Sequence, residues 1–404
     1  MADPDEDTWV NEGLADLAAR RAGFLAQNVV PFLMQPNTQL NAWVSDYKDA
    51  AAHYGAASLF IEFLADHYGG DEFVKTLIKR PENGMDGIEA ALDELGYGVS
   101  GLDVYQNWVI ANYLNADFGR HAYPNRSLRA GVSVLKELVV VPTVIDGSVV
   151  QFGTRYYVVK LGEPDLKIVF EGEANVRLFP ASPVSGESCW WGNRGNSIDT
   201  VLTRGFDLRS VDAAKLMWQV WYDIEEEWDY AYVEVSADGG EIWEILPTKL
   251  TRSSNPNGTA YGPGCSGSSL GWVDDGVDLS PYTGLEILVR FEYVTDDAVS
   301  LSGICLDDFK LPEIVWSDDA EQDRGWEAAG FVRTSNNISQ DFLLQAIRVG
   351  SNGQTIVKQL ADSYNGRVET IISGLAPQEL VAVVVSAIAP VTRNPATYKL
   401  QLDH

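Results

Sequence analysis

Hydrophobic positions recur with the period of an α-helix up to about residue 120 and with the period of a β-strand after about residue 125. In the segment HYGAASLFIEFLADHYGG, one predicted helical face carries Leu59, Phe60, Phe63 and Leu64. Helical patterns also occur in DEFVKTLIK, IEAALDEL and DVYQNWVIANYL. The first 120 residues are therefore predicted to form an all-helical unit of four or five helices.

Two short motifs indicate where helices begin. Asp86 and Glu89 have the spacing of a capping box before IEAALDEL, and Ser100 and Asp103 have the same spacing before DVYQNWVIANYL. In a capping box, each of the two side chains accepts a hydrogen bond from the backbone of the other residue. We therefore expect one helix to begin near residue 86 and another at Ser100.

The rest of the chain alternates short β-branched and aromatic runs with Gly, Pro and Asp breakers, as in TRYYVVKL, LKIVFEG, KLMWQVWYDI and LEILVRFEYV. This pattern predicts antiparallel β-sandwich or jelly-roll domains. The fold class is thus an α+β multidomain protein. Its expected parts after the helices are a β region at 125–180, a jelly roll at 181–329 and a C-terminal β domain at 330–404. In one arrangement, the first and last of these form a single split sandwich that contains the jelly roll as an insertion.

Composition excludes several classes of protein. With 404 residues, 46% of them hydrophobic, the chain has enough apolar material for two or three folded domains. A net charge of -29 excludes the basic surface of a nucleic-acid-binding protein. No apolar run approaches the roughly 18 residues of a membrane-spanning helix. The N-terminal stretch MADPDEDTWV is acidic, so it is not a signal peptide.

The three cysteines are Cys189, Cys265 and Cys305. Such a small, odd number does not make a disulfide scaffold, and the spacing matches no zinc motif. One disulfide with one free thiol and three buried thiols are both compatible with the sequence.

The sharpest local feature is an acidic pair, Glu12 and Asp16, within TWVNEGLADLAA. Residues four apart share one helical face, so the two carboxylates lie close together. One interpretation is a helix start at which the helix dipole favours acids. In the other, one carboxylate binds a cation while the second accepts a hydrogen bond.

This segment resembles the helix that supplies the third zinc ligand in gluzincin peptidases, and it is most similar to hyicolysin-like members. The resemblance implies that Glu12 ligates zinc and that Asp16 orients a zinc-bound histidine. It also implies that Tyr54, at the start of the next long helix, stabilises the oxyanion of a tetrahedral intermediate. His53 is the alternative for that role, and a core tyrosine is the structural alternative for Tyr54.

The sequence departs from that family in its histidines, which are His53, His67, His121 and His404. None lies in a His-Glu-x-x-His motif, which would supply two zinc ligands and a general base. His53 and His67 are 14 residues apart on one predicted helix, so about 20 Å separates them. Either the chain is the C-terminal portion of a longer precursor, or it is an inactive relative.

The segments WWGNRGNSIDTVLTRGFDL and SGICLDDFKL resemble the β-sandwich that follows the catalytic domain in immune inhibitor A-type secreted peptidases. The similarity extends over about 180–345. Jelly rolls of this type also serve as adhesion and carbohydrate-binding modules, so the fold alone does not define a role.

Calcium is the cofactor expected in this sandwich, because Ca²⁺ takes oxygen ligands from strand ends. Asp307 and Asp308 are the main candidate ligands with Glu187, and Asp296 and Asp297 are weaker candidates. The alternative is a turn in which Asp is common. A solvated loop is the preferred interpretation of the acidic run Asp223, Glu225, Glu226, Glu227 and Asp229.

Two functions follow. The first is a fragment of an extracellular zinc metalloendopeptidase that acts on protein or peptide substrates, and it is expected to be inactive alone because the histidine half of its site is missing. The alternative is a non-catalytic surface module that binds a cell-wall polymer or a protein through calcium-stabilised β-sandwiches.

Overall fold

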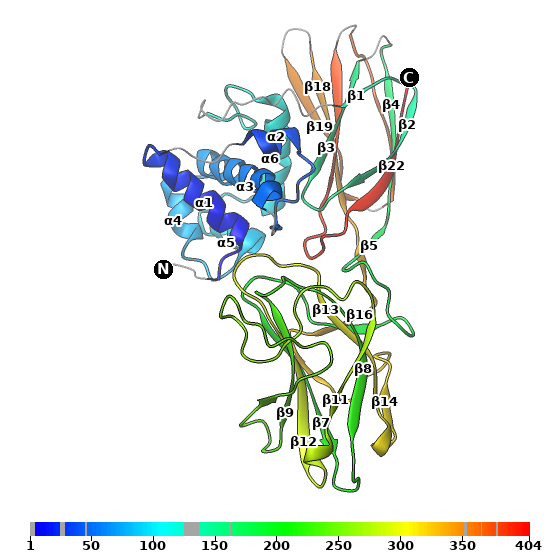
Figure 1. The fold of residues 1–404 in the computed structure, drawn as a ribbon. Helices are drawn as coiled ribbons and strands as arrows, with labels where there is room; N and C mark the ends of the chain where they lie inside the picture. The colour runs from blue at the N-terminus through cyan, green and yellow to red at the C-terminus, as the bar shows by residue number, and fades with distance from the viewer. Residues whose placement is uncertain are drawn as a thin grey trace. The chain divides into compact units, whose positions relative to one another are not determined.

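The chain divides into two compact units in the computed structural model (Figure 1). Unit 1 comprises Met1–Val176 and Ile338–His404, and unit 2 comprises Arg177–Asn337. The structure describes residues 5–24, 29–44, 47–124, 137–160, 163–350, 354–364, 366–376 and 379–404. Part of the β region predicted at 125–180, residues 125–136, lies outside the described residues.

Unit 1 begins with six helices among its described residues, so the predicted helical region is confirmed, with more helices than the four or five expected. Their bounds are α1 Thr8–Arg21, α2 Val30–Met34, α3 Tyr47–His67, α4 Asp71–Leu77, α5 Gly84–Glu94 and α6 Gly101–Leu114.

Of the two helix starts predicted from capping boxes, the structure confirms one and contradicts the other. Ser100 caps α6 in a capping box with Asp103, as the spacing predicts. The box predicted at Asp86 is wrong, because α5 begins at Gly84. Its first amide donates to the Glu6 carboxylate over 2.7 Å. A carboxylate that is distant in sequence therefore takes the place of a local cap.

The crossing of α1 over α3 is unusually close at Gly13. A Cβ atom at this position would lie 2.5 Å from Cγ1 of Ile61 and 2.8 Å from the carbonyl oxygen of Ala57. Real Cβ atoms do not approach other atoms so closely, so glycine is required for this packing. Trp9 and Leu17 are buried on the same side of α1. The crossing sets the position of the neighbouring acidic pair.

A β-sandwich completes unit 1. One sheet has the order β1-β3-β21-β18-β19 and the other the order β2-β22-β4-β20. All pairs are antiparallel except β1 with β3. Strands from before the jelly-roll region thus pair with strands from the end of the chain. Their bounds are β1 Glu137–Val139, β2 Thr143–Val149, β3 Thr154–Lys160, β4 Leu166–Gly172, β18 Phe342–Val349, β19 Thr355–Tyr364, β20 Arg367–Ile372, β21 Leu380–Ala387 and β22 Ala396–Asp403.

The helices and the sandwich of unit 1 meet at α6 and β3. The hydroxyl of Tyr156 on β3 donates to the carbonyl of Val109 over 2.8 Å, and its ring stacks on Tyr113. Both tyrosine side chains are buried. The inner faces of the two sheets enclose a separate apolar core, which includes Phe170 and Phe342.

Unit 2 is a second sandwich of two antiparallel sheets, ordered β10-β9-β12-β7-β15 and β11-β8-β13-β6-β16, with β14 paired to β13. Its core includes Trp218, Phe291 and Phe309. The strands are β6 Cys189–Trp191, β7 Asp199–Asp207, β8 Lys215–Asp223, β9 Tyr230–Ser236, β10 Glu244–Ile245, β11 Val273–Asp278, β12 Glu286–Val294, β13 Gly303–Leu311, β14 Trp316–Asp318, β15 Glu327–Ala329 and β16 Val332–Thr334. Two 3₁₀ helices, Ser280–Tyr282 and Pro312–Ile314, follow β11 and β13, and β5 Asn175–Arg177 pairs with β17 Asn337–Ser339. The fold class predicted from the sequence, helices followed by antiparallel sheets, is confirmed.

A disulfide joins Cys189 on β6 to Cys305 on β13, and Cys265 is a buried free thiol. The alternative of one disulfide with one free thiol is therefore the observed one. Burial raises the pKa of the Cys265 thiol to about 12, which keeps it protonated and unreactive.

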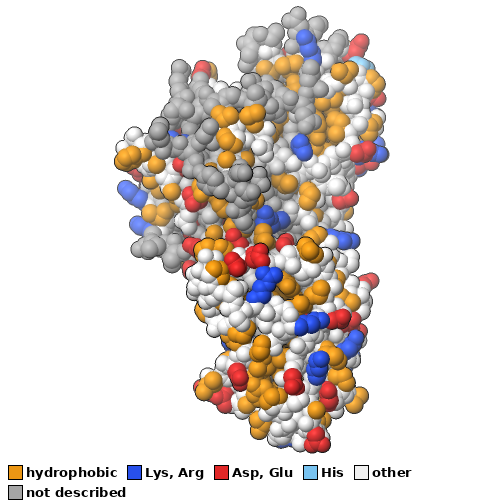
Figure 2. Space-filling view, viewed as in Figure 1, with side chains coloured by type: hydrophobic (Ala, Val, Ile, Leu, Met, Phe, Trp, Pro, Cys, Tyr) orange, Lys and Arg blue, Asp and Glu red, His pale blue; other side chains and the backbone are white. Residues whose placement is uncertain are grey.

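The acidic side chains that give the protein its negative net charge do not cluster on the face drawn in Figure 2. There, the coloured Asp and Glu side chains are spread over both units, with Lys and Arg among them. No helix within the described residues combines the length and apolar character of a membrane span.

Candidate functional site

The predicted acidic pair and the predicted tyrosine meet where α1 crosses α3. Glu12 is half-buried, and its carboxylate accepts a hydrogen bond from the hydroxyl of Tyr54. The ring of Trp43 packs edge-on against the Tyr54 ring, with the two centroids 4.7 Å apart. Asp16 lies one turn further along α1 and is 8% exposed. The structure therefore brings together three residues that the sequence singled out.

The surroundings of Glu12 act on its pKa in both directions. Burial raises this pKa most, and the charge of Asp16 raises it further. The hydrogen bond from Tyr54 opposes both effects because it stabilises the ionised carboxylate. The net result is a raised pKa. A positive charge next to Glu12 would reverse this shift, because it favours the charged form.

One turn beyond Asp16, an ion pair fixes how α1 lies on α3. The guanidinium of Arg20 is 3.4 Å from the carboxylate of Glu62 and also donates to the Ser58 hydroxyl. The side chains of both charged partners are largely buried. Breaking a buried pair leaves an uncompensated charge, so this contact favours one register of the two helices.

The histidines do not complete a metal site around Glu12. Helix α3 runs without a break from Tyr47 to His67, so His53 and His67 are held about 20 Å apart. The Nε2 atom of His67 is 2.9 Å from the carbonyl oxygen of Ala122, and that of His121 is 3.0 Å from the Asn107 side chain. Among the described residues, Glu12 belongs to no group of three metal-ligating side chains.

A cavity of about 700 Å³ lies on another face of α1, against α4. Its lining is mostly aliphatic and includes neither Glu12 nor Tyr54. The principal lining residues are Leu14, Leu17, Ala18, Val74 and Ile78.

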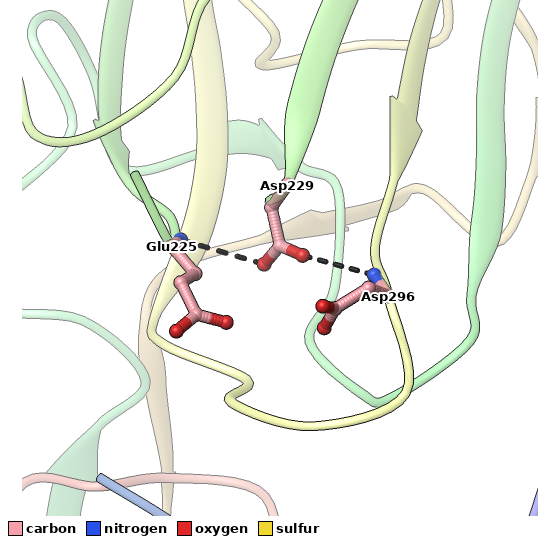
Figure 3. Close-up of side chains that lie close together, drawn as sticks. All are labelled: Glu225, Asp229 and Asp296. Atoms are coloured by element: carbon pink, nitrogen blue, oxygen red, sulfur yellow. Dashed lines mark hydrogen bonds between the residues drawn. The ribbon is translucent and has the colours of Figure 1, made fainter. Parts of the chain in front are cut away.

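A second acidic site lies in unit 2, where Glu225, Asp229 and Asp296 converge (Figure 3). One carboxylate oxygen from each residue lies within 4.8 Å of the others. Asp229 is 1% exposed, and its carboxylate accepts from the backbone amides of Asp296 over 3.0 Å and of Glu225 over 3.4 Å. The group therefore combines three close oxygens with a backbone that holds the central carboxylate in place.

Burial is the main cause that raises the pKa of Asp229 to about 7, with a further contribution from the carboxylates of Asp296 and Glu225. Burial also raises the pKa of Asp296. Among the described residues, no Lys or Arg forms a salt bridge with either aspartate. The carboxylates thus repel one another in a partly desolvated site.

The sequence interpretation of 223–229 as a solvated loop is wrong for Asp229, which is buried. The run of acidic residues is visible in the sequence, but Asp296, which contacts Asp229, lies 67 residues further along the chain. Asp296 was only a weaker candidate ligand. One sequence signal could have indicated this site: Asp229 stands directly before the strand YAYVEVS. Every residue of that strand is buried in the structure.

The calcium ligands predicted from the sequence, Asp307, Asp308 and Glu187, do not belong to this acidic group. Asp307 is fully buried and accepts from the amides of Val184 and Asp308, each over 2.8 Å. Burial raises its pKa to about 6. The Asp308 carboxylate accepts from the Ser185 hydroxyl. Among the described residues, neither these two aspartates nor Glu187 belongs to a group of three close metal-ligating side chains. Calcium binding by them stays a prediction.

Comparison with known proteins finds a family match within the β region. Residues 168–336 match the sequence family described as "Immune inhibitor A-like, MAM domain". Over 157 residues the chain is 31% identical to Immune inhibitor A of Bacillus thuringiensis subsp. alesti, which covers 38% of this chain and 22% of that protein.

Two further relatives carry the names of peptidases. The Pre-pro-metalloprotease PrtV of Vibrio cholerae serotype O1 is 27% identical over 174 residues, which is 42% of this chain and 18% of the relative. Bacillopeptidase F of Bacillus subtilis is 28% identical over 140 residues, which is 33% of this chain and 9% of the relative. The chain therefore spans less than a quarter of each relative, and what it shares with the Immune inhibitor A-like family is the MAM-type region at 168–336.

Proposed function

We propose that residues 1–120 provide the glutamate-bearing part of the active site of a secreted zinc metallopeptidase that cleaves protein substrates. The observation that carries the proposal is the contact between Glu12 and Tyr54. Gly13 allows the helix crossing that brings the two residues together. The relation of the β region to peptidases such as PrtV supports this proposal, and the Cys189–Cys305 disulfide fits an oxidising, extracellular compartment.

The described residues do not by themselves fit a catalytic zinc ion. Such a site takes three protein ligands, usually with histidine among them, and this arrangement offers the single carboxylate of Glu12. In the proposal, the two histidine ligands and the general base come from polypeptide outside these 404 residues. The chain alone is therefore expected to hydrolyse no peptide bonds.

Within that proposal, the residues of this chain hold the glutamate in a defined state. Tyr54 orients the Glu12 carboxylate and favours its ionised form, which is the form that binds metal. The Arg20–Glu62 ion pair and the close crossing at Gly13 keep α1 from sliding along α3. The three features together make a rigid support for one ligand.

The first test is to determine the coding sequence directly upstream of the Met1 codon. An open frame that encodes His-Glu-x-x-His within a few tens of residues would support the proposal. An in-frame stop codon and a ribosome-binding site directly before Met1 would overturn it.

A longer chain that carries that motif allows a sharper test. The Glu12→Gln variant should lose stoichiometric zinc and casein hydrolysis, whereas Glu72→Gln, an exposed acid at the start of α4, should keep both. Equal zinc content in the two variants would contradict the role of Glu12. Stoichiometric zinc and chelator-sensitive casein cleavage by the 404-residue chain itself would contradict its expected inactivity.

The second candidate function is a non-catalytic binding module. It is favoured by one observation, which is that the family match at 168–336 lies outside the helices. It predicts that Glu12→Gln changes neither metal content nor binding, so the same pair of variants separates the two functions.

A further inference from the structure

We propose that Glu225, Asp229 and Asp296 bind a calcium ion that ties together two connections between the sheets of unit 2. This inference goes beyond the proposed peptidase function and depends on none of the residues around Glu12.

The geometry of the three carboxylates suits one ion. Two oxygens that each lie 2.3–2.6 Å from a Ca²⁺ ion are at most about 5 Å apart. The three carboxylate oxygens here lie within 4.8 Å of one another. The donors are all oxygens, without the imidazole or thiolate that zinc usually takes. Calcium also accepts irregular geometry and completes its shell with water, whereas Mg²⁺ demands a near-ideal octahedron.

A buried hydroxyl beside the carboxylates gives an independent indication of a ligand. Tyr293 is 0% exposed, and its hydroxyl makes no hydrogen bond of ordinary geometry with a described protein atom. The hydroxyl lies next to the Asp229 carboxylate. Buried hydroxyls normally have a partner, and a water molecule in the shell of the ion would provide one.

The charges of the site also favour a cation. The buried carboxylate of Asp229 lies close to those of Asp296 and Glu225, so three negative charges repel one another there. No salt bridge from a described Lys or Arg offsets this effect at either aspartate. A bound divalent ion would supply the positive charge that offsets this repulsion.

The positions of the three residues in the fold suggest what the ion does. Glu225 and Asp229 lie in the connection from β8 to β9, which passes from one sheet to the other. Asp296 follows β12 and lies in the connection from β12 to β13, which returns to the first sheet. One ion would therefore clamp two sheet-to-sheet connections. Such an ion stabilises the folded state because the unfolded chain lacks the site.

The test uses the full chain after treatment with a chelator, with CaCl₂ as the probe. Wild-type protein should show a rise in Tm and saturable heat of binding in calorimetry. Glu225→Gln and Asp296→Asn should each weaken Ca²⁺ binding by roughly tenfold or more, because ligand charge sets affinity. Both side chains are only half-buried, so folding of these variants can be verified by circular dichroism without Ca²⁺.

Glu226→Gln is the matched control. It removes the same charge from the adjacent position, where the carboxylate pairs with Arg252 at 2.6 Å and lies outside the group. This variant should bind Ca²⁺ like wild type. If Glu225→Gln and Glu226→Gln show the same Ca²⁺ affinity, or if wild type binds no Ca²⁺, the proposal is overturned.

Two further measurements make the assignment specific. Asp308→Asn should leave this binding event in place, and loss of all Ca²⁺ binding in that variant would instead place the ion at Asp308, within β13. Tb³⁺ bound in place of Ca²⁺ should show tyrosine-sensitised luminescence that falls in Tyr293→Phe. If the luminescence is unchanged both in Tyr293→Phe and in Glu225→Gln, the result counts against the site. Stabilisation by MgCl₂ equal to that by CaCl₂ would overturn the choice of calcium.

Discussion

The acidic pair on α1 and the acidic group of unit 2 use the same carboxylate chemistry, but different parts of the fold hold them. Glu12 and Asp16 lie one turn apart on a single helix, and Tyr54 on α3 is the partner of Glu12. Glu225, Asp229 and Asp296 come from two connections that are distant in sequence. The first site offers one carboxylate with a hydroxyl donor, whereas the second gathers three carboxylates around one point.

The difference shows what each kind of scaffold contributes. A helix fixes the spacing of its own side chains, so the pair on α1 is rigid, but one helix face supplies few ligands. Connections at the end of a sandwich converge from several strands, so they can supply a fuller set of oxygens. Backbone amides then hold the central carboxylate in place, as they do for Asp229.

The largest expected effect concerns the helix crossing. Gly13→Val should lower the free energy of unfolding by about 2–3 kcal/mol, because the added atoms overlap Ile61 and the Ala57 carbonyl. Urea unfolding followed by far-ultraviolet circular dichroism measures this loss. Ala15→Val adds two methyl groups to the exposed side of the same helix and should cost no more than about 0.7 kcal/mol. Equal losses in the two variants would contradict the close packing at Gly13.

The second expected effect concerns pH and the acidic group of unit 2. Asp229 has an ordinary pKa of 3.8 in the unfolded chain and a pKa of about 7 in the folded one. The folded state therefore holds this proton more tightly, and its stabilising contribution is lost as pH rises from about 4 to above 7. Without divalent cations, wild type should lose about 2 kcal/mol more than Asp229→Asn between pH 5 and pH 8.

Asp229→Asn is the necessary comparison because Asp307 and Glu292 in the same unit also have raised pKa values and add to the same trend. Chemical unfolding at the two pH values, in the presence of a chelator, provides the measurement. A pH dependence that is identical in wild type and Asp229→Asn would show that Asp229 does not titrate in this range. Added Ca²⁺ should reduce the difference between the two proteins.

The smallest expected effect concerns the hydroxyl of Tyr54. Tyr54→Phe should raise the pKa of Glu12, because the hydrogen bond that lowers this pKa is lost, and should reduce stability by about 1 kcal/mol. Carboxyl carbon NMR across a pH titration follows Glu12 directly. Tyr68→Phe removes a hydroxyl just after α3 that forms no hydrogen bond with the described residues, so the Glu12 titration should stay unchanged. A Glu12 pKa that does not move in Tyr54→Phe would contradict the contact.

Local patterns predicted part of this structure well. The Ser100–Asp103 capping box depends on two residues of one turn, and the structure contains it. The start of α5 could not be predicted in this way, because the carboxylate that accepts from its first amide belongs to Glu6, which is 78 residues away in the sequence. The acidic group of unit 2 was missed for the same reason, since Asp296 is remote from Asp229 in sequence.

By itself, the sequence determined the change from helices to strands near residue 120, the acidic pair on one helix face and the absence of a His-Glu-x-x-His motif. These features depend on periodicity and on neighbours within one helical turn, which local sequence encodes. Only the tertiary structure decided that Glu12 meets Tyr54, that Cys189 pairs with Cys305 and that Asp229 lies buried beside Asp296. Each of these contacts joins distant segments, and they meet because burial of apolar faces in the helical unit and the two sandwiches brings those segments together.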